Sequence, residues 1–156
     1  MIITVLRDIL IARGQLENYY EGLVPVNLWR ATNRKRPTAL FDFVEREFVL
    51  SNGRPRPADI KIEDRGGIAW VTVTDRPRGV STFDKPGIPA GKDWDYIKIP
   101  KNTTLSGGLA IVDDGYREAH DANHYTIAPA HDMPLAEFRA LLAQLAEILN
   151  AKGEVG

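Results

Sequence analysis

The sequence contains no cysteine, which excludes disulfide bonds and thiolate metal sites. Its 20 Lys and Arg residues nearly balance its 21 Asp and Glu residues, so net charge gives no reason to expect a surface that binds polyanions. No apolar run approaches the length of a membrane span. The first residues lack the basic region, long apolar segment and small-residue cleavage site of a signal peptide. We therefore expect a soluble protein that is made in the cytoplasm.

Several catalytic and cofactor motifs are also missing. The chain has no glycine-rich phosphate loop of the P-loop or dinucleotide-binding type, and no Gly-x-Ser-x-Gly sequence. Its histidines and the aspartates near them lack the spacing of a metal motif, so no metal site is predicted; these residues are His120, His124, His131, Asp113, Asp114 and Asp121. A hydrolase triad built from Ser81, one histidine and one aspartate stays open, because spacing along the chain gives no evidence on it.

The length of 156 residues and the 44% hydrophobic content predict a single domain, residues 1–156, with a proper core. Apolar residues recur at helical spacing over residues 2–20 and Gly14 interrupts them, so either one bent helix or two short helices fits. Another helix is predicted over Thr38–Leu50, capped near Thr38. The last is predicted over residues 132–151, with an apolar face that covers the core or an oligomer surface.

Between the terminal helices the pattern favours strands. A hairpin is predicted where two apolar stretches flank the turn Asp64-Arg-Gly-Gly67. Residues 51–57 form a break, and residues 85–94 form a long loop that is either a lid or a plain connection. The predicted strands are residues 26–31, 59–63, 68–74, 96–100, 109–113 and 124–128. The expected fold class is α+β, a mostly antiparallel sheet with an N-terminal helix and a C-terminal covering helix.

The segment Arg78-Gly-Val-Ser-Thr-Phe-Asp84 carries the first candidate site residues. Gly79 allows unusual φ angles or a close backbone approach directly before two adjacent hydroxyl groups. Val80 and Phe83 are expected to anchor the segment in the core, which leaves Ser81 and Thr82 to face a cavity or to pair with backbone. A simple strand whose hydroxyl groups satisfy neighbouring peptides fits the same pattern.

Arg30 lies at the end of an early predicted strand, before a polar loop. A guanidinium at that place suits a phosphate or a carboxylate ligand, because its planar fork donates two parallel hydrogen bonds. A structural ion pair is the alternative. The basic residues 33–37 that follow either lie over a diphosphate or form a solvated loop.

Six short motifs together resemble a family of bacterial toxins. They are Leu28-Trp-Arg-Ala-Thr-Asn33, Gly79-Val-Ser-Thr-Phe-Asp84, Tyr96-Ile-Lys-Ile-Pro100, Gly108-Leu-Ala-Ile-Val-Asp113, His124-Tyr-Thr-Ile-Ala-Pro129 and Asp132-Met-Pro-Leu135. The family consists of type VI secretion effectors with an ADP-ribosyltransferase-like fold, which are cytotoxic inside the cell and are held in check by a cognate immunity protein. The resemblance extends over residues 25–149. It implies an antibacterial toxin that uses NAD as a substrate, kept inactive in the producing cell and delivered into a target-cell cytoplasm.

The resemblance also assigns roles to residues. Arg30 matches the early-strand arginine that holds the NAD phosphates or ribose, and the Ser-Thr pair matches the strand that braces the nicotinamide pocket. The implied NAD-contacting residues are Arg30, Thr32, Asn33, Ser81, Thr82, Phe83 and Tyr125, with catalytic roles for Arg30, Ser81, Thr82 and His124. An aromatic ring, that of Trp29, Phe83 or Tyr125, would stack on nicotinamide. Since nicotinamide leaves behind a cationic ribose, the protein must mainly position the substrate and stabilise charge.

The chain departs from the superfamily pattern late in the sheet, where a glutamate is usual. After residue 84 the glutamates are Glu118, Glu137, Glu147 and Glu154, none of them in a predicted strand. His124 or Asp113 is a candidate to replace the missing group. Three functions therefore stay open. They are transfer of ADP-ribose to a macromolecule, transfer to water by an NAD glycohydrolase, and a non-catalytic toxin or binding module that acts by occupying a partner.

Overall fold

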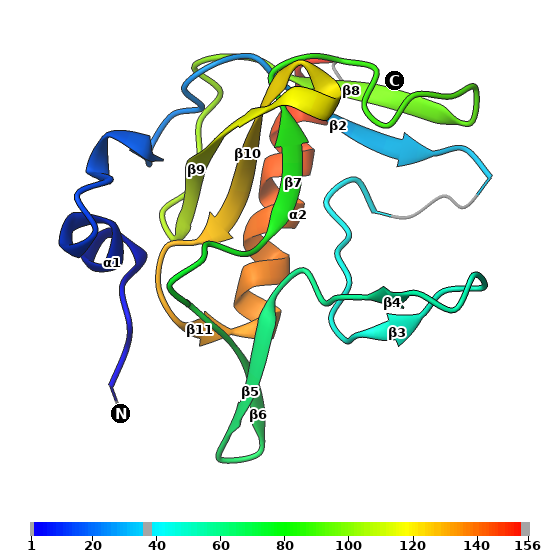
Figure 1. Cartoon of the computed structure of the whole chain (residues 1–156). Helices are drawn as coiled ribbons and strands as arrows, with labels where there is room; N and C mark the ends of the chain where they lie inside the picture. The colour runs from blue at the N-terminus through cyan, green and yellow to red at the C-terminus, as the bar shows by residue number, and fades with distance from the viewer. Residues whose placement is uncertain (1, 36–38, 154–156) are drawn as a thin grey trace.

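The computed structural model describes residues 2–35 and 39–153, and its centre is a six-stranded sheet with the order β1-β9-β10-β7-β2-β8 (Figure 1). The strands are β1 (Tyr19–Tyr20), β2 (Leu28–Asn33), β7 (Val80–Phe83), β8 (Trp94–Ile99), β9 (Leu109–Arg117) and β10 (Ala122–Pro129). The neighbouring strands in this sheet pair antiparallel. With a helix near each end of the chain, the sheet confirms the predicted α+β class.

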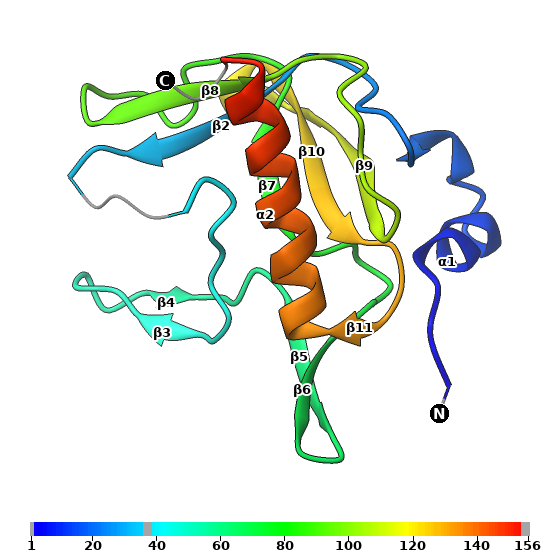
Figure 2. The same cartoon turned by 180° about the vertical axis from the view of Figure 1, so that it is seen from behind.

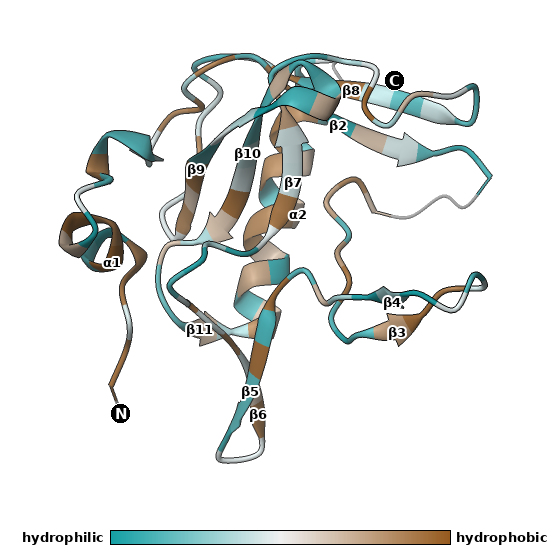
Figure 3. Cartoon of the chain, in the orientation of Figure 1, coloured by the Kyte–Doolittle hydropathy of each residue, from teal (hydrophilic) through white to brown (hydrophobic). Residues whose placement is uncertain are grey.

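The two faces of the sheet are covered unequally. Helix α2 (Leu135–Ala151) crosses one face and closes the larger core (Figures 1 and 2). Its inward residues Phe138, Leu142, Leu145 and Leu149 pack with strand residues that include Ile111, Tyr125 and Ile127. Helix α1 (Leu6–Ala12) forms a smaller cluster with small residues of β9 and β10 on the other face. Hydropathy colouring shows hydrophobic residues gathered along α2 and the central strands (Figure 3).

The N-terminal pattern forms two short helices, one of the two alternatives left open by the sequence. Helix α1 ends at Ala12 and the 3-10 helix η1 (Leu16–Asn18) follows. Gly14 between them has a φ of 68°, a conformation that glycine adopts at little cost. The helix therefore breaks at Gly14.

The helix predicted over Thr38–Leu50 is wrong for the residues that the structure describes, and Thr38 itself lies outside them. Residues 39–47 contain neither helix nor strand, and a hairpin of β3 (Phe48–Val49) and β4 (Pro55–Arg56) follows. The backbone of this segment bonds to distant parts of the chain. The Val44 N–H donates to a carboxylate oxygen of Asp59 (2.6 Å), and the Asp59 N–H donates to the Val44 carbonyl (2.7 Å). These tertiary contacts override the local helical preference.

A three-stranded sheet of β11 (Met133–Pro134), β6 (Ile68–Thr72) and β5 (Lys61–Arg65) confirms the predicted hairpin. Next to it, the carboxylate of the buried Asp132 accepts the Val73 N–H (2.7 Å), the Thr4 N–H (3.1 Å) and Arg65 Nη2 (2.8 Å). Burial acts to raise the pKa of Asp132, but these three donors outweigh it and lower that pKa below its ordinary value. Asp132 thus fastens the N-terminal segment and the hairpin to the start of β11.

Candidate functional site

Strand β7 presents its two hydroxyl groups to opposite faces of the sheet. Val80 and Thr82 are each only 1% exposed, whereas Ser81 and Phe83 are half-buried. This alternation is what a strand requires, because successive side chains point in opposite directions. Thr82 Oγ1 donates to the Tyr125 carbonyl (2.9 Å), so Thr82 pairs with backbone, one of the two alternatives that the sequence allowed.

Ser81 belongs to a chain of hydrogen bonds across three strands. Its Oγ lies 2.6 Å from Nε2 of His124, and Nδ1 of His124 lies 2.8 Å from a carboxylate oxygen of Asp114. Thr126 Oγ1 donates to the same oxygen. The side chains of His124 and Asp114 keep 19% and 17% of their surface exposed. A hydroxyl, an imidazole and a carboxylate in this order can move a proton from the hydroxyl to the imidazole.

Arg30 bonds to three backbone carbonyls. Its Nε donates to Leu40 (3.2 Å), its Nη1 to Ser81 (2.9 Å) and its Nη2 to Asp42 (2.8 Å). Its hydrogen-bond partners are thus carbonyl oxygens, and the structural ion pair that was one alternative is not what holds it. Burial lowers the pKa of Arg30, partly offset by the charges of Asp59 and Asp42. An arginine stays protonated even so, which leaves a positive charge at this point.

Strands β2 and β7 separate at Arg30. Among the described residues they pair at Trp29 and Phe83 alone, whereas β2 pairs with β8 along its full length. Figure 1 shows β2 and β8 turning away from β7 beyond that point. The guanidinium of Arg30 lies at this split, because it reaches the carbonyl of Ser81 from β2. The side chains of Arg30 and Ser81 lie on opposite faces of the sheet, and the hydrogen bond from Arg30 to the Ser81 carbonyl crosses between the two strands at this split.

A cleft of about 330 Å³ opens beside Arg30. Thr32, Asn33 and Trp94 line its strand side, and Asp42, Arg56 and Asp59 line the side opposite. Its volume lies at the lower end of the range for small-molecule sites. Both signs of charge border it, so it is suited to a ligand that carries charge and hydrogen-bonding groups.

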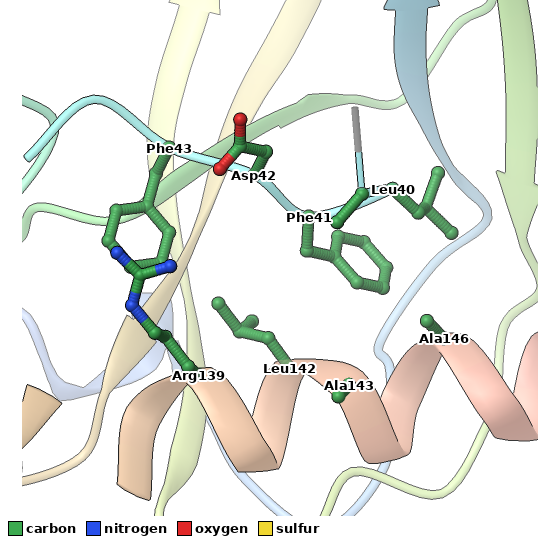
Figure 4. Close-up of a pocket in the computed structure, with 9 residues that line it drawn as sticks. Leu40, Phe41, Asp42, Phe43, Arg139, Leu142, Ala143 and Ala146 are labelled. Carbon is green, nitrogen blue, oxygen red and sulfur yellow. The ribbon is translucent and has the colours of Figure 1, made fainter. Parts of the chain in front are cut away.

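A smaller apolar pocket of about 110 Å³ lies between residues 39–43 and α2 (Figure 4). Phe41 points toward the helix, and Arg139 of α2 lies against the Phe43 ring, 5.2 Å from its centroid. Arg139 also forms an ion pair with Glu45. The pocket is too small for a typical small-molecule ligand. We interpret it as the packing side of the segment that offers carbonyls to Arg30.

The predicted site residues therefore fall into three groups. Arg30, Thr32 and Asn33 line the cleft, whereas Ser81, Phe83 and His124 lie on the other face of the sheet. Phe83 stands edge-on to the rings of His124 and His120, with ring centroids 5.0 and 5.2 Å away. Thr82 and Tyr125 form the third group, inside the core, where burial raises the pKa of Tyr125 to about 12.

Asp114 is the site residue that sequence reasoning missed as a partner of His124. The sequence leaves open which aspartate would join Ser81 and a histidine in a triad, and it singles out Asp114 only among the aspartates that could bind a metal. Among residues 2–35 and 39–153 no group of three or more His, Asp and Glu side chains is placed to hold a metal ion. A usable signal was Gly115, because a glycine inside a strand pattern often marks a bulge. Of the basic residues 33–37, Arg34 and Lys35 form exposed pairs with Asp95 and Asp93, and residues 36–37 lie outside the described ones.

Within the described chain, no helix combines the length and hydropathy needed to cross a membrane. A family model described as the Tse2 ADP-ribosyltransferase toxin matches residues 10–153. Toxin Tse2 of Pseudomonas aeruginosa is 38% identical over 55 residues, which are 35% of this chain and 34% of that protein. The chain therefore spans about a third of the length of the curated relative it matches. Because the family model covers most of the chain, this protein belongs to the Tse2 ADP-ribosyltransferase toxin family.

Proposed function

We propose that the protein is a toxin that binds NAD at the split between β2 and β7 and transfers ADP-ribose to a macromolecule inside a bacterial cell. Family membership supports the class of activity. One observation carries the location. Arg30 bonds to the backbone carbonyl of Ser81 and His124 bonds to its hydroxyl, so Ser81 links the three neighbouring strands β2, β7 and β10.

Arg30 is the proposed site for the diphosphate. The three hydrogen bonds from Arg30 to backbone carbonyls use three of the five N–H groups of its guanidinium, and these carbonyls contribute no negative charge. A diphosphate in the adjoining cleft would therefore meet a cation that has N–H groups to offer. Thr32, Asn33 and Trp94 are the proposed further contacts, because they line the same cleft. With a volume of about 330 Å³, the cleft would hold part of the dinucleotide.

His124 is the proposed base. In the reaction, the bond between C1′ of the ribose and the nicotinamide nitrogen breaks, and nicotinamide leaves with the bonding electrons. A hydroxyl or amine of the target then bonds to C1′ and gives up a proton. His124 Nε2 lies 2.6 Å from Ser81 Oγ in a side chain that is 19% exposed, so it is placed to take that proton through the Ser81 hydroxyl. Phe83, which lies edge-on to His124, would flank the nicotinamide ring.

Among the residues that the structure describes, no glutamate lies on a late strand of the six-stranded sheet, where the superfamily usually has one. Glu118 opens the 3-10 helix η2 (Glu118–His120), Glu137 and Glu147 lie on α2, and Glu154 is outside the described residues. His124 with Asp114 is the acid–base pair that the sheet offers in its place. In keeping with the family, we further propose a cognate immunity protein that holds the toxin inactive in the producing cell, and delivery by type VI secretion into the target cytoplasm.

The test is induced expression in a bacterial cytoplasm, comparing the wild type with Ser81→Ala and with Ser106→Ala as the matched serine control. Ser106 lies between β8 and β9 and bonds to Gln144 on α2. Growth and cellular NAD are followed, and lysates receive NAD radiolabelled in the adenylate phosphate. We expect growth arrest and a labelled macromolecule with the wild type and Ser106→Ala, and neither with Ser81→Ala.

Other outcomes contradict the transferase. Arrest with falling NAD and no labelled product would identify an NAD glycohydrolase. Arrest with intact NAD would identify a non-catalytic toxin, and unimpaired toxicity of Ser81→Ala would move the site elsewhere. Thermal unfolding of each variant shows whether a loss of toxicity reflects loss of the fold.

A further inference from the structure

We infer that Asp114 is a positioning residue, which fixes the ring proton of His124 on Nδ1 and so makes Nε2 the acceptor for the Ser81 hydroxyl. The consequence for the reaction rests on the proposed function, whereas the position of the proton does not. Three features carry the inference: where the backbone places Asp114, what its carboxylate imposes on the imidazole, and how Asp114 is itself held.

A bulge places Asp114 between two residues of β10. The register of β9 and β10 pairs Asp113 with Tyr125 and Gly115 with His124, so Asp114 has no partner on β10. Gly115 has a φ of 93°, and its N–H bonds to the side chain of Asp113 (2.8 Å), which stabilises the bulge. Asp114 can therefore contact both His124 and Thr126, neighbours on the same face of β10.

The carboxylate dictates which ring nitrogen carries the proton. A carboxylate oxygen only accepts hydrogen bonds, so the 2.8 Å contact requires a proton on Nδ1 of His124. In the neutral ring the other nitrogen, Nε2, then has a free lone pair. Ser81 Oγ, 2.6 Å away, must donate its proton to that lone pair. In the opposite tautomer a lone pair of Nδ1 would face the carboxylate oxygen at 2.8 Å, and two acceptors at this distance repel each other.

Asp114 is held in this orientation by a second donor. The hydroxyl of Thr126 donates to the same carboxylate oxygen that faces His124. The backbone ladder between β9 and β10 extends over eight residue pairs and does not use the side chain of Asp114. A purely structural role would therefore be kept by asparagine, which has the same shape and one carbonyl oxygen. The control of the tautomer would be lost, because an amide can also donate to Nδ1.

The proton of His124 can be located by NMR. Protein from cell-free synthesis with ¹⁵N-histidine is compared as wild type, Asp114→Asn and Asp121→Asn, and His120→Gln and His131→Gln variants assign the ring signals. Asp121→Asn is the matched control. In the wild type the carboxylate of Asp121 bonds to Tyr116 and Lys85, and the φ of 47° at this position suits asparagine. We expect the proton on Nδ1 in the wild type and in Asp121→Asn, and a mixture of tautomers in Asp114→Asn.

The same proteins are assayed for transfer of ADP-ribose from labelled NAD. We expect Asp114→Asn to lower the rate by about 10²-fold or more, the usual contribution of acid–base catalysis, with little change in thermal stability. A wild-type proton on Nε2, or a tautomer unchanged by Asp114→Asn, would overturn the inference. A changed tautomer with an unchanged rate would overturn the role in the reaction. If the wild type transfers nothing, the proposed function fails, and the tautomer still decides the inference.

Discussion

Gly79 lets β7 approach β10 closely, and replacing it with alanine should separate the two strands. A Cβ atom at this position would lie 2.0 Å from the carbonyl oxygen of Ile127 and 2.9 Å from its carbonyl carbon. Both neighbours are backbone atoms, so no side chain can rotate out of the way. The strands would have to part by about 1 Å at this point before the contact became tolerable.

The expected loss of stability follows from this clash. Overpacking typically costs about 1–3 kcal/mol, and we expect Gly79→Ala to reach the upper part of that range because backbone must move. For a protein of this size, 1 kcal/mol corresponds to a shift in Tm of about 2–4 °C. Gly79→Ala should therefore lower the Tm by about 5–10 °C. Ser81 lies two residues further along β7, and a parting of this size would stretch its 2.6 Å bond to His124.

The assay is thermal unfolding followed by circular dichroism, together with growth inhibition. Gly107→Ala is the matched control, since a Cβ at Gly107 meets nothing within 4 Å. We expect Gly107→Ala to match the wild type in Tm and toxicity. Gly79→Ala should have the lower Tm given above and a weaker toxicity. A Gly79→Ala protein with wild-type Tm and toxicity would refute the argument that close approach at Gly79 sets the position of β7.

Three further predictions concern other residues. Asp132→Asn should lower the free energy of unfolding by about 3 kcal/mol, because it leaves Arg65 without its buried charge partner; urea unfolding measures this, and a loss below 1 kcal/mol would contradict it. Because folding lowers the pKa of Asp132, its ionised carboxylate should stabilise the folded state fully at pH values above the ordinary aspartate pKa of about 3.9. This stabilisation should be lost as the pH falls through the pKa that Asp132 has in the folded protein. The wild type should therefore lose more stability in acid than Asp132→Asn. Gly115→Ala should cost about 1–2 kcal/mol, since its φ of 93° disfavours a side chain, and should weaken toxicity by displacing Asp114; full toxicity would argue against a role for the bulge.

The sequence predicted the fold where periodicity and packing agree. Over residues 132–151 the apolar spacing, the early Pro134 and the terminal Gly153 predict one amphipathic helix. Helix α2 is that helix from Leu135 on, whereas Met133–Pro134 form β11. Residues 39–47 carry a similar apolar spacing and form no helix. The difference lies outside the segment, because Arg30 and Asp59 take up its backbone groups.

The same limit applies to the candidate site. Ser81 and His124 could be chosen from their residue types, and the structure places them in contact. The sequence could not predict that Arg30 lies on the opposite face of the sheet from Ser81 and His124, because this depends on how β2 and β7 pair. Gly115 hints at a bulge, but the contact of Asp114 with His124 could not be predicted, since it also requires the register of β9 and β10.

The unequal covering of the sheet has a consequence for how such a protein can change over evolution. The residues that hold the fold together, such as Ile111 and Ile127, face α2 and are fully buried. Ser81, His124 and Asp114 lie on the opposite face and remain partly open to solvent. Substitutions there remove little buried apolar surface and should cost little free energy of folding. A lineage can therefore alter the reactive groups of this sheet one at a time while the fold persists.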